Sequence, residues 1–127
     1  MELLEITNEF IVNDINESID FYTKYFGFEV VLTDGDPVYW AKIQKNNICI
    51  MFETYEEVCK EYANYPEMTE SSNLIQFKCA NEEAVMNIYN TLHTANIPFF
   101  SELKKTEYGS VEFVIFDPDK NKIIVSC

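Results

Sequence analysis

The chain has 127 residues, of which 47% are hydrophobic and 15% aromatic, and this composition suits one domain with a real core rather than a disordered segment. Its 22 acidic and 9 basic residues give a formal net charge of −13. Such a charge argues against binding to nucleic-acid phosphates and to anionic membrane surfaces, because both need clustered Lys and Arg. A cationic small molecule or a basic partner remains compatible with it.

The cysteines and the ends of the chain indicate a cellular location. Cys49, Cys59, Cys79 and Cys127 fall at no metal-binding or redox spacing. The chain starts with an acidic segment instead of an apolar leader, and no apolar run reaches the length of a membrane span. We therefore expect a cytoplasmic protein with free thiols.

The first half of the chain predicts a strand, a helix and three more strands. A strand is expected over about residues 3–12, followed by a helix capped by Asp14 or Asn16, with Ser18 a weaker candidate. Gly27 supplies the left-handed residue at which a helix commonly stops. Strands are then expected over 28–33, 38–44 and 48–53, with turns at 34–37 and 45–47.

The segment from about 55 to 72 is acidic, contains tyrosines and has few aliphatic residues. It predicts a short helix near 55–63 and then a mobile connector. A solvated linker is the preferred interpretation of its charge, and a docking site for a basic partner is the alternative.

The second half repeats the pattern of the first about 67 residues later. A strand is expected over 73–79 and a helix over 81–94, capped by Asn81, with Asn96 where the first copy has Gly27. A short edge strand at 98–100, a polar loop with Lys104 and Lys105, and strands over 110–116 and 122–127 complete it. The fold class is therefore α+β, with two tandem βαβββ modules (about 1–54 and 73–127) forming a curved mixed sheet around a cleft and with helices on the outer face.

Three motifs in order resemble the vicinal oxygen chelate superfamily, which includes glyoxalase I, ring-cleaving dioxygenases and bleomycin-resistance proteins. They are the segments 18–22 (SIDFY), 26–28 (FGF) and 108–119 (YGSVEFVIFDPD), and the resemblance covers essentially the whole chain. It implies two sheet modules cradling a cleft, commonly completed by dimerisation, so we expect a homodimer.

Enzymes of this superfamily hold a metal ion with His, Glu or Gln from four strands. The resemblance places those positions on Thr7, Met51, Asn73 and Ile124. None of these side chains is a good ligand for a divalent metal, so we expect no metal and no cofactor. The alternative is a lyase or dioxygenase whose metal lies on displaced carboxylates, namely Glu9, Glu53 and Glu112.

Other catalytic chemistries have weaker support. The single histidine, His93, is expected late in the second helix, where it interacts with the helix dipole. Asp117, Asp119 and Asn121 imitate the start of a calcium loop, but Lys122 stands where that loop needs glycine, so we interpret the segment as a turn. No phosphate-binding glycine pattern is present.

These considerations favour a binding cleft with apolar and aromatic walls over an active site. Period-two alternation in the strands and the resemblance together select its expected lining: Thr7, Glu9, Trp40, Met51, Glu53, Asn73, Ile75, Phe77, Tyr108, Glu112 and Ile124. The function expected from the sequence is metal-free binding and sequestration of a planar or cationic organic compound such as an antibiotic. Packing of the same aromatic residues in the core or at a subunit interface is the alternative.

Overall fold

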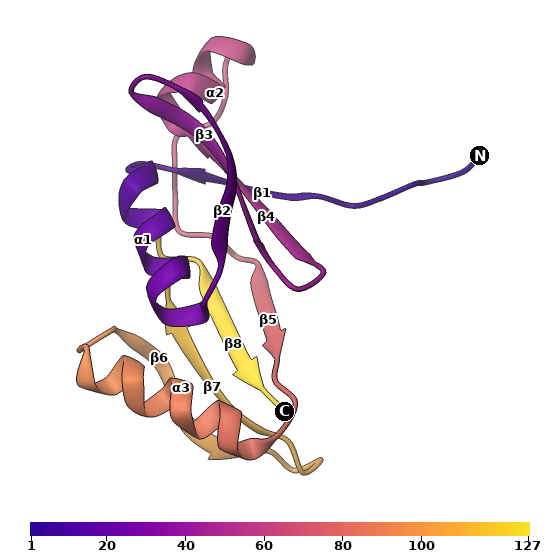
Figure 1. Ribbon diagram of the computed structural model, residues 1–127, viewed down its shortest axis with the longest axis vertical. Coiled ribbons are helices and arrows are strands. Elements are labelled where there is room, and N and C mark those ends of the chain that lie inside the picture. Colours follow the sequence, from indigo (N-terminus) through magenta and orange to yellow (C-terminus); the bar gives the residue numbers. More distant parts are fainter. The chain divides into compact units, whose positions relative to one another are not determined.

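The computed structural model describes residues 1–127, whose contacts divide the chain into two compact units, Met1–Met68 and Thr69–Cys127. Each unit is a βαβββ module, and the boundary falls within the acidic connector. The first module contains β1 (Asn8–Val12), α1 (Ile15–Phe26), β2 (Glu29–Gly35), β3 (Val38–Lys45), β4 (Ile48–Thr54) and α2 (Tyr55–Glu61). The second contains β5 (Leu74–Lys78), α3 (Glu82–Thr94), β6 (Phe99–Lys105), β7 (Val111–Phe116) and β8 (Lys122–Ser126) (Figure 1).

The two modules share one sheet topology. The strand order is β1-β4-β3-β2 in the first sheet and β5-β8-β7-β6 in the second. In each, the first strand of the module lies parallel to the last, and the other pairs are antiparallel. Both sheets are mixed and open, which confirms the α+β fold and the repeat expected from the sequence.

An aromatic core joins α1 to the first sheet. Tyr22 of α1 is fully buried, and its ring lies 5.4 Å from that of Phe52 and 6.1 Å from that of Phe10. Ala41, Ile43 and Ile50 complete this surface, so α1 covers one face of the sheet. The alternation of side chains along each strand leaves the other face uncovered by α1.

Sequence-local signals start and stop α1. The Asp14 carboxylate accepts hydrogen bonds from the backbone N–H groups of Asn16 (3.1 Å) and Glu17 (3.2 Å), so Asp14 is the N-cap. Gly27 ends the helix in the left-handed conformation, with φ +72°. A side chain there would be strained and would also meet Lys45 Nζ at 2.7 Å.

The second module repeats this arrangement with different residues. Asn81 caps α3 by accepting a hydrogen bond from the Ala84 N–H (2.9 Å), and Asn96 adopts the left-handed conformation (φ +57°) just beyond the helix. Tyr89 of α3 packs on Phe99 and Phe113, with ring centroids 5.4 Å apart in both pairs. His93 lies in the last turn of α3, where its Nε2 lies 3.0 Å from the Glu102 carboxylate.

Two boundaries differ most from the sequence-based expectation. Residues 3–7, expected in the first strand, are extended and pair with nothing, and the strand starts at Asn8. Lys104 and Lys105, expected in a loop, belong to β6, which is an edge strand but is longer than predicted. Both errors concern non-local pairing, which decides where an extended segment becomes a strand.

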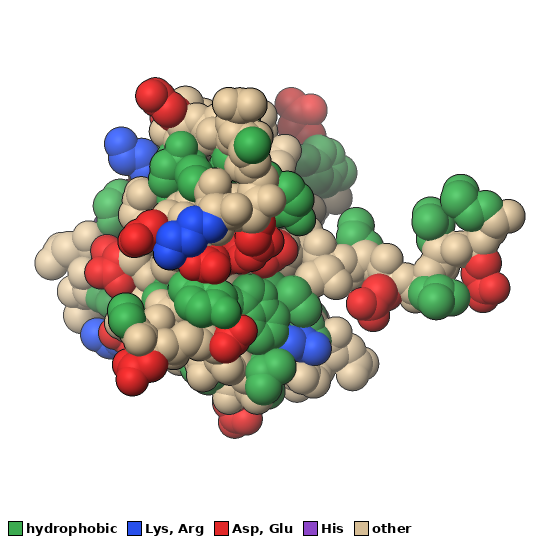
Figure 2. Space-filling model, turned by 90° about the horizontal axis from the view of Figure 1, so that it is seen from above, with side chains coloured by type: hydrophobic (Ala, Val, Ile, Leu, Met, Phe, Trp, Pro, Cys, Tyr) green, Lys and Arg blue, Asp and Glu red, His purple; other side chains and the backbone are tan.

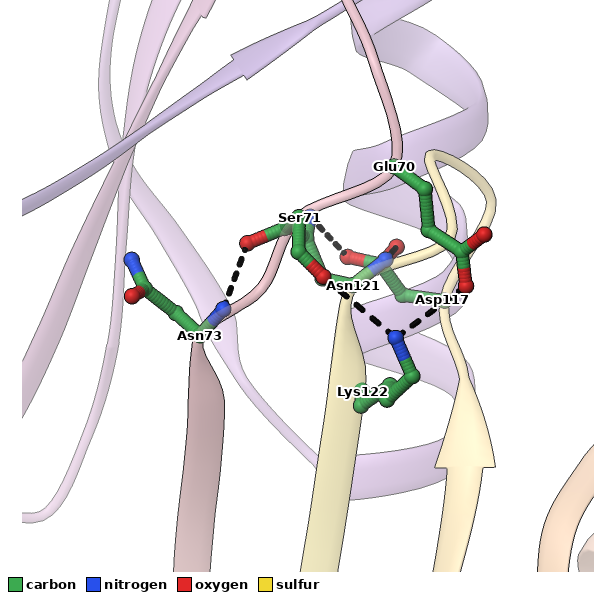
Figure 3. A network of polar contacts seen from close by, with 6 residues as sticks. All are labelled: Glu70, Ser71, Asn73, Asp117, Asn121 and Lys122. Carbon is green, nitrogen blue, oxygen red and sulfur yellow. Dashed lines mark hydrogen bonds and ion pairs between the residues drawn. The ribbon is translucent and has the colours of Figure 1, made fainter.

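A polar network fixes the end of the connector to the second sheet (Figure 3). Lys122 Nζ at the start of β8 donates to Glu70 Oε1 (3.1 Å) and to the Ser71 carbonyl (3.3 Å). Asn121 donates its side-chain amide to Asp117 Oδ2 (2.9 Å), and Asp117 Oδ1 accepts the N–H groups of Asp119 and Asn121. The Asp117 carboxylate therefore builds the predicted turn, and the part of the connector next to β5 is held in place rather than free.

Residues Met1–Thr7 form an extended arm. Leu3, Leu4 and Ile6 are 83%, 84% and 90% exposed. Figure 2 shows apolar side chains of the arm surrounded by solvent. None of the helices is long and apolar enough to span a membrane.

Candidate functional site: the open face of the first sheet

Strand pairing assigns the predicted site residues of the first module to one face. Trp40 of β3 lies directly opposite Glu53 of β4. Glu9 of β1 pairs in parallel with Met51 of β4, and Ile11 pairs with Glu53. Because paired residues point to the same side, these side chains share the face that α1 does not cover, termed the open face. Its residues are Glu9, Ile11, Trp40, Lys42, Met51 and Glu53.

Opposite neighbours in an antiparallel pair have Cβ atoms about 4.5–5.5 Å apart. The half-buried indole of Trp40 therefore lies beside the carboxyl group of Glu53. Glu9 of β1 lies two residues before Ile11, the residue that pairs with Glu53 on the other side of β4. Four of the residues predicted from the sequence (Glu9, Trp40, Met51 and Glu53) thus come together. Thr7 precedes β1, in the exposed arm.

Helix α2 covers part of the open face. It follows β4 directly, starts at the N-cap Thr54, whose hydroxyl accepts the Glu57 N–H (3.2 Å), and packs against β4 and β1. Beneath it Glu53 is only 5% exposed. Burial, a hydrogen bond with Glu61 and the charges of Glu61, Glu9 and Glu57 raise the pKa of Glu53 to about 7.

Sequence reasoning missed Glu61, although a signal for it existed. Val58 is the one apolar aliphatic residue of α2 and therefore has to face the sheet, where it is 2% exposed. Residues three apart lie on the same face of a helix, so Glu61, although exposed, lies on the side of α2 that carries Val58. This placement accounts for the effect of Glu61 on the pKa of Glu53.

A hollow of about 580 Å³ lies within the first module, and none of the six open-face residues lines it. It is bounded by the start of α1, the turn between β2 and β3, and the first turns of α2. Four of its side chains are acidic (Asp14, Asp36, Glu56 and Glu57), and Lys60 is its one base. Its electrostatic potential therefore favours cations over anions.

In the second module, pairing divides the predicted site residues between the two faces. Ile75 pairs with Ile123, and Phe77 pairs with Val125. Ile123 and Val125 are fully buried in the core against α3. The expectation that Ile75 and Phe77 share a face with Ile124 is therefore wrong. Alternation counted from Asn73 places Ile75 and Phe77 in the cleft, but Asn73 lies outside the strand. The residue of β5 that pairs with Ile124, and so shares its face, is Gln76.

The remaining predicted residues of the second module do not form one cluster. Glu112 of β7 and Ile124 of β8 lie on the face opposite to α3, because Phe113 and Ile123 occupy the covered face. Tyr108 is 85% exposed in the turn between β6 and β7. Asn73 donates its backbone N–H to Ser71 Oγ (3.1 Å) in the network of Figure 3.

The residues present do not fit a metal ion. No three His, Cys, Asp or Glu side chains lie close enough together to hold one. On the open face the candidate donors are Glu9, Met51 and Glu53, and Glu53 shares a hydrogen bond with a second carboxyl group. Divalent metals of the kind used by hydrolases and lyases prefer several carboxylates and imidazoles, whereas this set has no imidazole and its third member is a thioether.

Comparisons with known structures give the same fold. A glyoxalase-related enzyme from Fulvimarina pelagi is 15% identical and aligns over 98% of this chain and 88% of its own, with a TM-score of 0.83. A lactoylglutathione lyase from Agrobacterium tumefaciens is 19% identical, with 97% and 92% covered and a TM-score of 0.77. A glyoxalase/bleomycin resistance protein/dioxygenase family enzyme from Burkholderia phytofirmans PsJN is 21% identical, with 93% of each chain covered and a TM-score of 0.80.

At these identities the likeness establishes the fold alone. No curated protein is significantly similar in sequence. The sequence profile of one family matches residues 4–125, which is nearly the whole chain. The chain therefore belongs to the Glyoxalase/Bleomycin resistance protein/Dioxygenase superfamily.

Proposed function

We propose that the protein binds a small planar organic cation on the open face of the first sheet, without a metal, and sequesters it rather than converting it. The observation that carries this proposal is the placement of Trp40 directly opposite Glu53 on adjacent strands. An indole face and an ionised carboxylate attract the same ligand, one through its π-electrons and the other through its charge, which Glu53 carries above its pKa of about 7. A cationic antibiotic is one compound of this class.

Three further observations support a cationic ligand. Glu9 and Met51 adjoin the Trp40–Glu53 pair and offer a second carboxylate and a polarisable thioether. A separate hollow of the same module has acidic walls, and the whole chain has a net charge of −13. An anionic protein attracts cations over long range and raises their rate of association.

The affinity sets how many contacts are needed. Micromolar binding requires about 8 kcal/mol, whereas a cation over a tryptophan ring contributes about 0.5–2 kcal/mol. Trp40 alone is therefore insufficient, and the carboxylates and the apolar surface have to act together.

Calorimetric titration with proflavine and ethidium, two planar aromatic cations, tests the proposal. We expect micromolar dissociation constants for the wild type and weakening by about 2- to 30-fold in Trp40→Ala, which corresponds to the cation–π energy above. Tyr108→Ala removes an exposed aromatic ring in the second module and should leave the affinity unchanged. A planar anion such as pyrenesulfonate should not bind.

The alternative is a metal-dependent lyase or dioxygenase, as the sequence also allows. Metal analysis of protein purified without chelators separates the two functions. A stoichiometric transition metal that is lost in Glu53→Gln would contradict the proposal, as would cation binding that is indifferent to both Trp40 and Glu53.

We also propose that the protein acts as a homodimer and that the arm contributes to the contact between subunits. Three large aliphatic side chains are almost fully exposed on this arm. Burial of a leucine side chain contributes about 1.5–3 kcal/mol, so covering the arm offers a substantial driving force for association. A second copy of the chain also presents an exposed apolar edge strand, β2, with Val30, Val31 and Leu32.

A further inference from the structure

Two of the four free cysteines face each other across neighbouring strands of the second sheet. Strands β5 and β8 are parallel, and their register, which ends with Lys78 opposite Ser126, continues by one more pair to Cys79 and Cys127. A backbone hydrogen bond supports this continuation, because the Cys79 N–H donates to the Ser126 carbonyl (2.7 Å). In a parallel pair a residue donates to the carbonyl just before its own partner, so the partner of Cys79 is Cys127.

Cys127 is also held on its other side. Its backbone N–H donates to the Val111 carbonyl of β7 (3.2 Å), and its carbonyl accepts a hydrogen bond from the Ser110 hydroxyl (3.1 Å). The Val111 side chain is 7% exposed. The backbone of Cys127 is therefore fixed between Cys79 on one side and Val111 on the other, and its thiol has a defined starting position.

The two thiols share one face of the sheet. Alternation along β8 places Cys127 on the same face as Val125, which is fully buried in the core against α3. Cys79 follows Phe77, the partner of Val125, onto that face. Both cysteine side chains are half-buried, so they lie at the margin of this core, where a small reagent can reach them.

This arrangement meets the geometric requirement of a disulfide. Neighbouring strands lie about 4.8 Å apart, and the Cα atoms of disulfide-bonded cysteines are about 4.4–6.8 Å apart. The other cysteines have no such partner, because Cys49 lies opposite Gln44 and Cys59 belongs to α2. A metal site is not supported, since no third His, Cys, Asp or Glu joins the two thiols.

We propose that Cys79 and Cys127, termed the cysteine pair, are a redox modification site that closes to an intramolecular disulfide when a small disulfide such as glutathione disulfide accumulates. Strand β5 is an edge strand, and β8 is its one neighbour in the sheet. Helix α3 starts at Glu82, three residues after Cys79. The new bond fastens the end of β5 from which the chain enters α3.

The bond forms by two successive thiol–disulfide exchanges. Burial raises the pKa of the Cys79 thiol, so we expect the Cys127 thiolate to attack glutathione disulfide first and to displace one glutathione thiolate. The Cys79 thiolate then attacks the Cys127 sulfur of the mixed disulfide and displaces the second glutathione. Two protein thiols are oxidised, glutathione disulfide is reduced to two glutathione molecules, and the two thiol protons pass to them.

Peptide mapping by mass spectrometry of the folded, fully reduced chain after incubation with glutathione disulfide tests the proposal. Remaining thiols are blocked with N-ethylmaleimide before digestion. We expect linked peptides that contain Cys79 and Cys127, formation at a rate independent of protein concentration, and loss of the link with dithiothreitol. Cys79 and Cys127 that are only blocked or only carry glutathione would overturn the proposal, and so would a link that forms only in urea.

Two matched variants show whether the strands select the pair. Cys127→Ser removes the partner, so Cys79 should form no link within the chain. Cys59→Ser removes the exposed thiol of α2 and should cross-link as the wild type does. A link from Cys79 to another cysteine in Cys127→Ser would contradict selection by strand pairing.

Amide exchange followed by NMR measures the effect on β5. We expect the amides of residues 77–79 to exchange about tenfold more slowly in the oxidised than in the reduced wild type, because local opening has to separate the edge strand from β8. Cys127→Ser with the same oxidant should show no change. Equal exchange in the cross-linked and reduced wild type would overturn the fastening of β5. All residues of the pair belong to the second module, so this outcome is independent of cation binding by the first.

Discussion

Glu53 has a pKa of 4.5 as an ordinary side chain and about 7 in the folded protein, because burial and the adjacent carboxyl groups disfavour its ionised form. The folded state therefore keeps the proton at pH values where the unfolded chain has lost it. This contribution to stability is complete below about pH 4.5 and declines as the pH rises through about 7.

We expect Glu53→Gln, which has no proton to lose, to match the wild type near pH 4 and to exceed its free energy of unfolding by about 1–3 kcal/mol at pH 8. Urea unfolding across this range measures the difference, Glu56→Gln is the control, and parallel pH profiles of Glu53→Gln and wild type would contradict the assignment.

Single residues also show how far the sequence can predict this site. The shared face of Met51 and Glu53 was predictable, because alternation within one strand needs only local information, whereas Trp40 was selected by the family resemblance. Ile75 and Phe77 were not, because the face that they occupy depends on register with β8, which lies about 50 residues further along the chain. Glu61 was overlooked because its partner belongs to a different element.

Among the elements, the stability of the two long helices, α1 and α3, depends on N-cap residues that the sequence predicts. Asp14→Ala and Asn81→Ala each remove the hydrogen-bond acceptor for the first turn of a helix, and we expect each to cost about 1 kcal/mol of stability. Asn90→Ala, in the exposed middle of α3, should cost nothing, because alanine is the better helix former. Thermal unfolding measures all three, and an Asn90→Ala variant as unstable as Asn81→Ala would show that the cap is not the cause.

The strands were less predictable than the helices for the same physical reason. A helix satisfies its backbone within one segment, so periodicity, cap and stop residue define it. A strand exists only where a partner is available, and residues 3–7 have the composition of a strand without a partner in the first sheet. The extension of β6 through Lys104 and Lys105 is likewise determined by its pairing with β7.

For the whole molecule, the exposed arm is the feature with the clearest consequence in solution. We expect the wild type to show about twice the chain mass of 14.9 kDa in light scattering at micromolar concentration. Leu3→Asp combined with Leu4→Asp should shift it toward the monomer, because charged side chains cannot be buried without a large cost. Tyr108→Asp alters an equally exposed residue outside the arm and should leave the mass unchanged. A double variant that stays dimeric would exclude the arm from the interface.

The pairing of the opening strand with the closing strand in each half has a consequence of its own. In the first sheet, strands β1, β2, β3 and β4 pair only with one another, within residues 8–54. In the second sheet, strands β5, β6, β7 and β8 pair only with one another, within residues 74–126. A backbone cut between Met68 and Thr69 would therefore separate no strand from its pairing partner, and the contact between Glu70 and Lys122 would remain within the second half. Each half-length peptide therefore contains every strand partner that its own sheet needs.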